Sequence, residues 1–524
     1  MRALTVKGTR YDSARVFSSE NAPEQYAAAE LVKYLEKMGV PAGEGGLEFD
    51  LSIDPAIGRD GFAIRIGEDR ISITGGNGRG VLYGVYGFLE KYAGARFFMP
   101  GLETLGEGDI VVDEDYAFTP IFEFRQLDWI CGNVDEDWRL KNRVNYYARG
   151  TTAAHKGGQM KYGAFVHTLG GFTNTPPDQQ PCLSDPENLK KTIAAVRGIL
   201  EKDPEVTIVS VSQNDNFAYC KCEKCAAVDA EEGSHAGTLI RFVNEVAADI
   251  EKDYPHVVID TLAYQYTRAV PRVTKPRDNV CIRLCSIECC FSHPLDDESC
   301  PENKKFHEDI VDWSKICDRI YIWDYVTDFS YYIPTFPNFG VLRQNMRFFA
   351  THGVRGMYPE GNYQSTSGEF GELRCYLLAK LMWDPMMSAN EYYRHMDEFL
   401  AAYYGVGWRY IRAYIDFTCA EAAGTHMNIW ANPFHIISRE KYAAMEETFD
   451  TWWDKAEAMA GDRLDAVKRS RIQWRYIKLM LRPDAEAGRA LRDDVEKDGI
   501  RWNEWHSLPE DVDYAKSPDK WFEK

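Results

Sequence analysis

Four acidic side chains stand at the ends of apolar runs that have the composition of buried strands. Glu288 follows the run VCIRLCSI, and the same pattern places Asp215 after VTIVSVSQN, Asp324 after RIYIW and Glu360 after RGMYP. A charged group at the end of an apolar strand is costly to bury unless it has a partner or a task. Cleavage of a glycosidic bond needs such groups, because one carboxyl protonates the leaving oxygen while an anion meets the oxocarbenium-like charge. The alternatives are ion pairs with nearby Arg or Lys, and ligation of a cation.

Polar and aromatic residues follow the same runs and could bind a sugar. Asn214 and Asn216 flank Asp215, where their amide groups would reach sugar hydroxyls, and His167 and His293 also follow predicted strands. Aromatic rings stack on sugar faces, although core packing is the alternative for each ring and hydrogen-bonded packing is the alternative for each histidine. The aromatic residues near strand ends that we predict to bind substrate are Trp129, Tyr264, Trp323, Tyr325 and Tyr363.

Three cysteines a few residues beyond Asp215 have the spacing C-x-C-x2-C. They are Cys220, Cys222 and Cys225, and Cys182 is available as a fourth ligand from an earlier loop. The C-x2-C pair is typical of zinc sites, and four thiolates form a closed structural site rather than a catalytic one. We therefore predict a structural zinc ion here and no cofactor for catalysis. A reduced, thiol-rich loop and a single disulfide are the alternatives.

Helical runs separate the strand-like runs, and this alternation predicts a barrel of parallel strands. Amphipathic segments at 186–203 and 235–254 flank the run that ends in Asp215, and others follow the runs that end in Asp324 and Glu360. The carboxyl ends of the strands in a (β/α)8 barrel form one rim, where its active sites lie. We predict such an α/β TIM barrel over residues 120–385, with strands at 121–129, within 135–150, and at 162–172, 206–215, 257–266, 280–288, 319–325 and 355–361.

Different patterns flank the predicted barrel on its two sides. Residues 1–115 combine alternating strand patterns with two helical segments, which predicts a small α+β domain. Residues 386–524 contain no strand-like run, so we predict a helical C-terminal region. Its polar tail holds Trp505 and Trp521, which we interpret as docking anchors. The segments with helical spacing in this region are 389–404, 408–423, 439–460, 462–481 and 484–497.

The composition argues against several classes of partner. The chain of 524 residues has a formal net charge of -20, which disfavours nucleic acid and anionic membranes, because phosphate binding needs basic patches. No apolar run is long enough for a membrane span, and no apolar segment near the N-terminus resembles a signal peptide. The 13 cysteines indicate reduced thiols, so we predict a cytoplasmic protein, although a secreted chain whose signal had been removed would look the same. Nothing in the sequence predicts the oligomeric state.

Several separated motifs carry a resemblance to a known family. The stretches SQNDNFAYCKCEKC, SIECCFSHPL, IYIWDYVTDFSYYIPTFPNF and EFGELRCYLLAKLMWDP together resemble the domain of unknown function 4838. That group includes the family-163 glycoside hydrolases, which are endo-β-N-acetylglucosaminidases acting on complex N-glycans, and the resemblance spans residues 120–400. The preceding segments AAAELVKYLEKMG and GVLYGVYGFLEKYAGARFF look like the small α+β domain before the barrel of β-hexosaminidases and α-glucuronidases.

The resemblance implies a retaining glycosidase that cleaves β-linked N-acetylhexosamine glycans of the GlcNAc type. Such enzymes often use the acetamido oxygen of the substrate as nucleophile, with one carboxylate orienting that amide and a neighbour acting as acid. The sequence departs from the family-20 pattern because Asn216, not Glu, follows Asp215. The acid must then be Glu288 or Glu360. Alternatives are an α-glucuronidase-like exo-glycosidase, which needs a cationic partner for the substrate carboxylate, and a non-catalytic carbohydrate-binding protein.

The sequence neighbours of the carboxyl groups predict different tasks for them. Glu288 lies in the apolar and sulfur-rich segment 287–291, and apolar surroundings would raise its pKa and keep the proton that a general acid needs. Asp324, between two aromatic residues, would hold the acetamido group or the developing charge. Glu360 precedes a glycine whose bare backbone would let a ligand approach closely, and it is the alternative acid.

Overall fold

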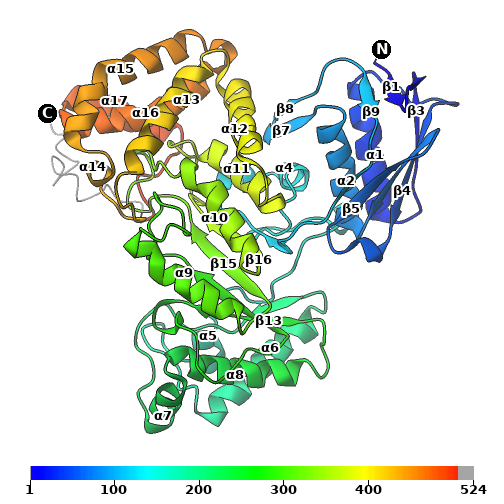
Figure 1. Cartoon of the computed structure of the whole chain (residues 1–524). Coiled ribbons are helices and arrows are strands. Elements are labelled where there is room, and N and C mark those ends of the chain that lie inside the picture. Colours follow the sequence, from blue (N-terminus) through cyan, green and yellow to red (C-terminus); the bar gives the residue numbers. More distant parts are fainter. Residues whose placement is uncertain (1, 506–524) are drawn as a thin grey trace.

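The N-terminal part of the chain is a layer of strands packed against two helices (Figure 1, blue). In the computed structural model, which describes residues 2–505, α1 and α2 cover a five-stranded sheet of order β10-β5-β6-β4-β3. Asn77 accepts a hydrogen bond from Gly80 N at 2.7 Å, so the glycine-rich turn starts a helix. The bounds are β1 Leu4–Val6, β2 Thr9–Tyr11, β3 Ala14–Phe17, α1 Ala22–Lys37, β4 Leu47–Ile53, β5 Phe62–Ile66, β6 Arg70–Gly75, α2 Gly78–Lys91, β7 Arg96–Met99, β8 Leu102–Thr104, β9 Ile110–Val112 and β10 Tyr116–Phe118.

A sheet of six parallel strands follows and forms a half-barrel at the centre of the molecule (Figure 1, green). Its strand order is β11-β16-β15-β14-β13-β12. Helices α9 and α10 connect the last three strands, α8 precedes β13, and α11 follows β16. Because the strands are parallel, their carboxyl ends all lie at one edge of the sheet. The bounds are β11 Phe124–Arg125, β12 Ile208–Ser210, α8 His235–Ile250, β13 Val258–Ala263, β14 Val280–Cys285, α9 Pro301–Ser314, β15 Ile320–Tyr325, α10 Phe339–Thr351, β16 Val354–Glu360 and α11 Gly371–Trp383.

The chain is irregular where the sequence predicts the second and third strands. Tyr146 and Tyr162 make isolated parallel bridges with the two edges of the sheet, but neither belongs to a strand. The predicted strand at 162–172 is wrong, because Leu169–Thr173 form helix α5. The physical reason is the left-handed backbone at His167, whose φ of 53° ends an extended conformation. The described residues therefore show a six-stranded parallel sheet, and the eight-stranded barrel of the prediction is not seen in full.

Aromatic side chains fill the inner face of the half-barrel below its carboxyl edge. Phe124 and Tyr321 stack there with ring centroids 5.2 Å apart. Beside them Arg283 Nη2 lies 2.8 Å from Asp260 Oδ2, and both side chains are 0% exposed. Tyr162 donates its hydroxyl to the same carboxylate at 3.0 Å, so the buried charges are paired and hydrogen-bonded. This packed layer forms the floor of the space at the carboxyl ends of the strands.

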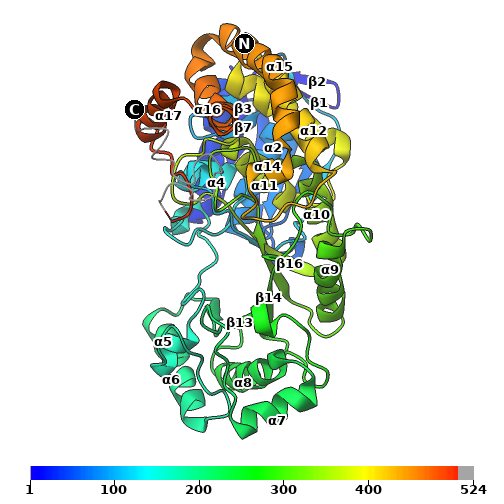
Figure 2. The same ribbon diagram turned by 90° about the vertical axis from the view of Figure 1, so that its left-hand side faces the viewer.

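The C-terminal part of the chain forms a group of helices that packs against α10 and α11 (Figure 2, yellow to red). Except for the short helix α14, which was not predicted, their bounds agree with the predicted helices to within two residues. Their apolar faces join one core with α10 and α11. Among the described residues, no helix is long and apolar enough to cross a membrane. Trp521 lies outside the described residues. The bounds are α12 Ala389–Tyr404, α13 Trp408–Ala422, α14 Pro433–Ile436, α15 Arg439–Ala458, α16 Leu464–Leu481 and α17 Ala485–Lys497. The remaining helices are α3 Ile130–Asn133, α4 Glu136–Lys141, α6 Pro186–Lys202 and α7 Glu223–Glu232.

Candidate active site

A cavity of about 830 Å³ opens at the carboxyl ends of the parallel strands. Three of the four predicted carboxyl groups, Asp215, Glu288 and Glu360, line it. The predicted substrate-binding residues His167, Asn216, Tyr264, Trp323 and Tyr325 line it too. The wall is completed by residues that the sequence did not single out for this role, namely Phe217, Leu262, Gln265, Cys285, Ile287, Phe329, Ile429, Trp430, Glu504 and Trp505.

Glu360 is a partly buried carboxyl group that lines this cavity. It is the last residue of β16, and its Oε2 accepts a hydrogen bond from Trp323 Nε1 at 2.8 Å. Burial raises the pKa of Glu360 to about 8, and the nearby charges of Asp128 and Glu504 add to this effect. The hydrogen bond from Trp323 and the charge of Arg149 oppose it. With this pKa the carboxyl is mostly protonated at neutral pH, which is the state that a general acid requires.

A second acid, Asp128, lies behind Glu360 in a network that the sequence analysis missed. Asp128 Oδ2 accepts a hydrogen bond from Tyr358 at 2.7 Å, and its Oδ1 lies 2.7 Å from Arg149 Nη1. Burial raises the pKa of Asp128, whereas its contact with Arg149 lowers it. The signal was present in the sequence, because Asp128 lies near the end of the predicted first strand at 121–129, as the other four acids lie near the ends of theirs.

Glu288 faces the cavity in surroundings unlike those predicted for it. Its side chain is 50% exposed, and its carboxylate forms an ion pair with Arg268. Arg268 Nε also lies 2.8 Å from Asp309 Oδ2, so one guanidinium holds two carboxylates. The apolar neighbours Cys289 and Phe291 are buried in the core. The expectation that apolar walls surround Glu288 is therefore wrong, and a charged partner takes their place.

Asp215 stands on another wall and has neutral donors around it. Its Oδ1 accepts a hydrogen bond from Gln265 Nε2 at 3.2 Å, and the Tyr264 hydroxyl is also within hydrogen-bonding reach. Asn216 uses its amide to hold the loop, because Nδ2 donates to Pro177 O at 2.8 Å. Gln265 lies in a short 3-10 helix and has a left-handed backbone with φ 53°, which turns the chain at the cavity wall.

Asp324 does not line the cavity, and this corrects the prediction that all four carboxyl groups converge. Its neighbours Trp323 and Tyr325 line the cavity, with nearly parallel rings whose centroids are 6.3 Å apart. Side chains alternate between the two faces of a strand, so Asp324 points to the opposite face. It is 4% exposed and accepts a hydrogen bond from Ser286 Oγ at 2.7 Å. Burial raises the pKa of Asp324 to about 6.

Four predicted substrate-binding residues also lie elsewhere. Asn214 is buried and holds a loop, since its Oδ1 accepts from Gly170 N at 3.1 Å and its Nδ2 donates to Gln179 O at 2.7 Å. Trp129 is 1% exposed, and a Cβ on Gly361 would meet its ring at 1.9 Å, so that glycine makes room for Trp129 rather than for a ligand. Tyr363 stacks with the Arg149 guanidinium at 4.3 Å, and His293 lies in a separate cluster described below.

Three exposed aromatic residues stand at the mouth of the cavity. Phe217, Trp430 and Trp505 are 65%, 45% and 60% exposed. All three line the same cavity, and their flat faces suit a sugar ring. Trp505 was predicted to anchor the tail, and the structure places it at the cavity instead. Trp430 belongs to the loop after α13, which no local sequence pattern could place beside the sheet.

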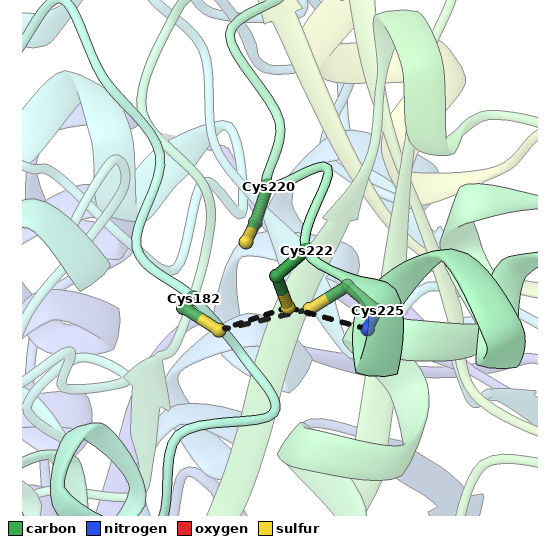
Figure 3. A group of neighbouring side chains, drawn as sticks. All are labelled: Cys182, Cys220, Cys222 and Cys225. Carbon is green, nitrogen blue, oxygen red and sulfur yellow. Dashed lines mark hydrogen bonds between the residues drawn. The ribbon is translucent and has the colours of Figure 1, made fainter.

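The four predicted zinc ligands converge at the N-terminal end of α7, where Cys182 arrives from the segment before α6 (Figure 3). Cys182 Sγ lies 3.7 Å from Cys222 Sγ and 3.8 Å from Cys225 Sγ, and all four sulfurs lie within 4.8 Å of one another. Four ligands about 2.3 Å from one zinc ion in a tetrahedron would stand about 3.8 Å apart. Hydrogen bonds from backbone and neighbouring thiols lower the pKa of Cys222 to about 7. The spacing of the sulfurs fits the predicted ion, and zinc binding itself stays a prediction.

The α/β fold is similar to that of solved glycoside hydrolases. A family GH115 4-O-methyl-α-glucuronidase with specificity for decorated arabinogalactans matches 95% of this chain and 76% of its own length, with 12% identity and a TM-score of 0.57. A GH138 enzyme targeting pectin rhamnogalacturonan II is a weaker match, with 11% identity, a TM-score of 0.48 and coverage of 98% of this chain and 99% of its own. A Flavobacterium johnsoniae chitobiase is another, with 9% identity, a TM-score of 0.46 and coverage of 98% of this chain and 97% of its own. At these identities the likeness concerns the fold.

The family is identified by sequence. The model of the domain of unknown function DUF4838 matches residues 106–416, which is more than half of the chain, so the protein belongs to this family. The match covers the half-barrel, its cavity-lining strand ends, helix α12 and the first part of α13. No curated protein matches the sequence.

Proposed function

We propose that the protein is a glycoside hydrolase and that Glu360 is its general acid. One observation carries this proposal: a partly buried carboxyl group whose pKa is raised to about 8 faces a cavity of about 830 Å³. Two other carboxyl groups of the same cavity, Glu288 and Asp215, have cationic or neutral donors around them. In glycoside hydrolases, two carboxyl groups with different surroundings usually have different roles: one donates the proton and the other acts as the anion.

The reaction starts with transfer of the Glu360 proton to the glycosidic oxygen, while the bond between that oxygen and the anomeric carbon breaks. Trp323 Nε1 donates to Glu360 Oε2, so it stabilises the carboxylate that forms. We assign Asp215 the second task, because its two neutral donors hold it in place without neutralising it. In substrate-assisted cleavage, Asp215 accepts a hydrogen bond from the acetamido N–H while the acetamido oxygen attacks the anomeric carbon. Water then opens the resulting oxazolinium ring, and Glu360 takes back a proton.

The substrate class that we propose is a β-linked N-acetylhexosamine glycan, as in the family-163 enzymes that the motifs resemble. The exposed aromatic residues at the cavity mouth, Phe217, Trp430 and Trp505, supply platforms for sugar rings beyond the cleavage point. The runner-up is an α-glucuronidase-like exo-glycosidase, which is favoured by the presence of Arg268 next to the cavity. Its guanidinium is already held by Glu288 and Asp309, so it would have to exchange partners to bind a uronate.

We also propose that the half-barrel closes through the irregular segments near Tyr146 and Tyr162. Their bridges with Gln126 and Ile208 extend the two edges of the sheet, and Met160 N donates to Asn145 O at 3.1 Å between them. These contacts support eight barrel positions over residues 120–385, flanked by an α+β domain at 1–115 and a helical region at 386–524.

A structural zinc ion on Cys182, Cys220, Cys222 and Cys225 would fix the loop that carries Asp215 and Asn216.

A substrate panel tests the proposed activity. The wild-type chain is incubated with aryl β-N-acetylglucosaminides, aryl α-glucuronides and released complex N-glycans, and products are followed by NMR. Release of a β-anomer from an N-acetylhexosaminide supports a retaining hexosaminidase, and turnover of the glucuronide alone supports the runner-up. Binding of a glycan without turnover of any substrate would identify a non-catalytic carbohydrate-binding protein and contradict the proposal.

A further inference from the structure

A second group of metal-ligating side chains lies apart from the four-cysteine cluster. Cys290, His293, Cys300 and His426 each offer one ligand atom, and these atoms lie within 4.8 Å of one another. Cys290 Sγ is 3.3 Å from His293 Nδ1, and Cys300 Sγ is 3.7 Å from His426 Nδ1. The ligands come from three places: the loop after β14, the residue that precedes α9, and the loop after α13.

The orientation of His293 is the one that a metal ligand needs. Its Nε2 lies 3.0 Å from the carbonyl oxygen of Ala423, and a carbonyl can only accept, so Nε2 carries the hydrogen. In the neutral ring, Nδ1 then carries no hydrogen, and its lone pair is free to bind a metal. This nitrogen lies next to the Cys290 sulfur. A backbone carbonyl that fixes the tautomer in this way is the usual outer partner of a metal-bound histidine.

The two cysteines of the cluster are buried, and the two histidines lie on its side toward the surface. Cys290 and Cys300 are each 2% exposed, whereas His426 has 46% of its side chain exposed. Met427 N points at Cys290 Sγ from 3.5 Å, and a backbone donor of this kind stabilises a thiolate. Glu302 Oε2 lies 2.8 Å from His426 Nδ1, which places a carboxylate beside the exposed imidazole.

We propose that Cys290, His293, Cys300 and His426 form a second structural zinc site. Two thiolates and two imidazoles in a closed cluster are a ligand set that selects zinc over hard cations such as magnesium and calcium. Binding displaces one proton from each cysteine, while the histidines bind through neutral nitrogens. Because four protein ligands fill a tetrahedral shell, the site has no open position for a substrate or a water molecule and is structural.

The position of this site gives it a task next to the cavity. Glu288 lies two residues before Cys290, and Ile429 and Trp430 follow His426 closely in the chain. The two loops already meet through a hydrogen bond from Phe291 N to Met427 O at 2.7 Å. A metal ion bound between them would hold the Trp430 wall of the cavity at a fixed distance from the Glu288 wall, so it would couple the helical C-terminal part to the parallel sheet.

Metal analysis of matched variants tests this second site. Zinc is measured by mass spectrometry in the wild-type chain, in Cys220→Ser/Cys222→Ser and in Cys290→Ser/Cys300→Ser, all purified with zinc present. We expect zinc to persist in Cys220→Ser/Cys222→Ser. X-ray absorption of that variant should show sulfur near 2.3 Å and nitrogen at about 2.0–2.1 Å, as expected for two cysteines and two histidines.

A milder variant keeps the test independent of folding. His426→Ala removes an exposed ligand, and we expect it to lose this zinc to a chelator at least tenfold faster than the wild type, with an unchanged circular dichroism spectrum. His435→Ala is the control, because His435 is exposed in the segment after the same loop but does not belong to the cluster. Three results would overturn the proposal: Cys220→Ser/Cys222→Ser without zinc, equal zinc loss from both histidine variants, or a Cys290–Cys300 disulfide in the purified protein.

Discussion

Replacing Glu360 with Gln should stabilise the folded protein at neutral pH while it removes the proposed proton donor. Burial raises the pKa of this carboxyl from its ordinary value of 4.5 to about 8. A carboxyl whose folded-state pKa lies above its unfolded-state pKa binds more protons in the folded protein. The free energy of unfolding therefore falls as the pH rises through the interval between the two pKa values, and stays constant above the higher one. Glutamine carries no charge, so Glu360→Gln lacks this loss.

The magnitude follows from the part of that interval that lies below pH 7. About 2.5 pH units at 1.36 kcal/mol per unit give an upper bound of roughly 3 kcal/mol. Glutamine can keep the local hydrogen bond, because its side-chain oxygen can accept from Trp323 Nε1, which lies 2.8 Å from Glu360 Oε2 in the wild type. We expect Glu360→Gln to be more stable than the wild type by about 1–3 kcal/mol at pH 7, and by little below the unfolded-state pKa.

Urea unfolding at a series of pH values between about 4 and 9, followed by tryptophan fluorescence, measures this difference. Asp324→Asn is the matched control, because Asp324 is a buried acid of the same sheet whose pKa is raised only to about 6. The difference in the free energy of unfolding between Asp324→Asn and the wild type should therefore stop growing above about pH 6. For Glu360→Gln it should grow until about pH 8. If Glu360→Gln has the same pH dependence as the wild type, or is less stable at pH 7, the carboxyl is ionised in the folded protein and cannot be the resting general acid.

Four further outcomes follow from the site. The kcat/KM of the wild type should fall as the pH rises above about 8, because Glu360 then loses its proton. Glu288→Gln should lower turnover by a similar factor on substrates with good and poor leaving groups, since Glu288 is ion-paired and does not donate the proton. Asp324→Asn should keep near-normal turnover, because Asp324 points away from the cavity; a hundredfold loss in a kinetic assay would restore its predicted role. Trp430→Ala should raise KM about 3- to 10-fold with little change in kcat, as expected for a lost stacking contact of about 0.5–1.5 kcal/mol.

The sequence predicted best those features that repeat along the chain. The strands β12 to β16 and the helices α12, α13, α15, α16 and α17 each have a clear period, and their positions match the predicted ranges, whereas the four-residue helix α14 was not predicted. The prediction of strands near Tyr146 and Tyr162 was wrong because the backbone of these segments makes only isolated bridges with the neighbouring segments, not a continuous ladder of hydrogen bonds. A period cannot reveal such contacts, since they depend on which segment lies alongside.

Within the site, the sequence located most of the acids but could not assign their surroundings. Asp324 and Glu360 both end apolar runs, yet the alternation of the strand turns one outward and the other inward. Glu288 has apolar neighbours in the chain, but its carboxylate meets Arg268, twenty residues earlier. The pKa of a carboxyl depends on contacts of this second kind. Trp430 and His426 come from a distant loop, so no local pattern could join them to the cavity or to the second cysteine cluster.

The most direct test of the account is the turnover of two kinds of substrate by the wild type and by Glu360→Gln. Removal of a general acid costs about 10²–10⁴ in rate where the leaving group needs a proton. We expect a loss of this size on a natural glycan and a much smaller loss on an aryl glycoside with a good leaving group. Equal turnover of the natural glycan by Glu360→Gln and the wild type, or equal losses on both substrates, would contradict the assignment of Glu360 as the proton donor.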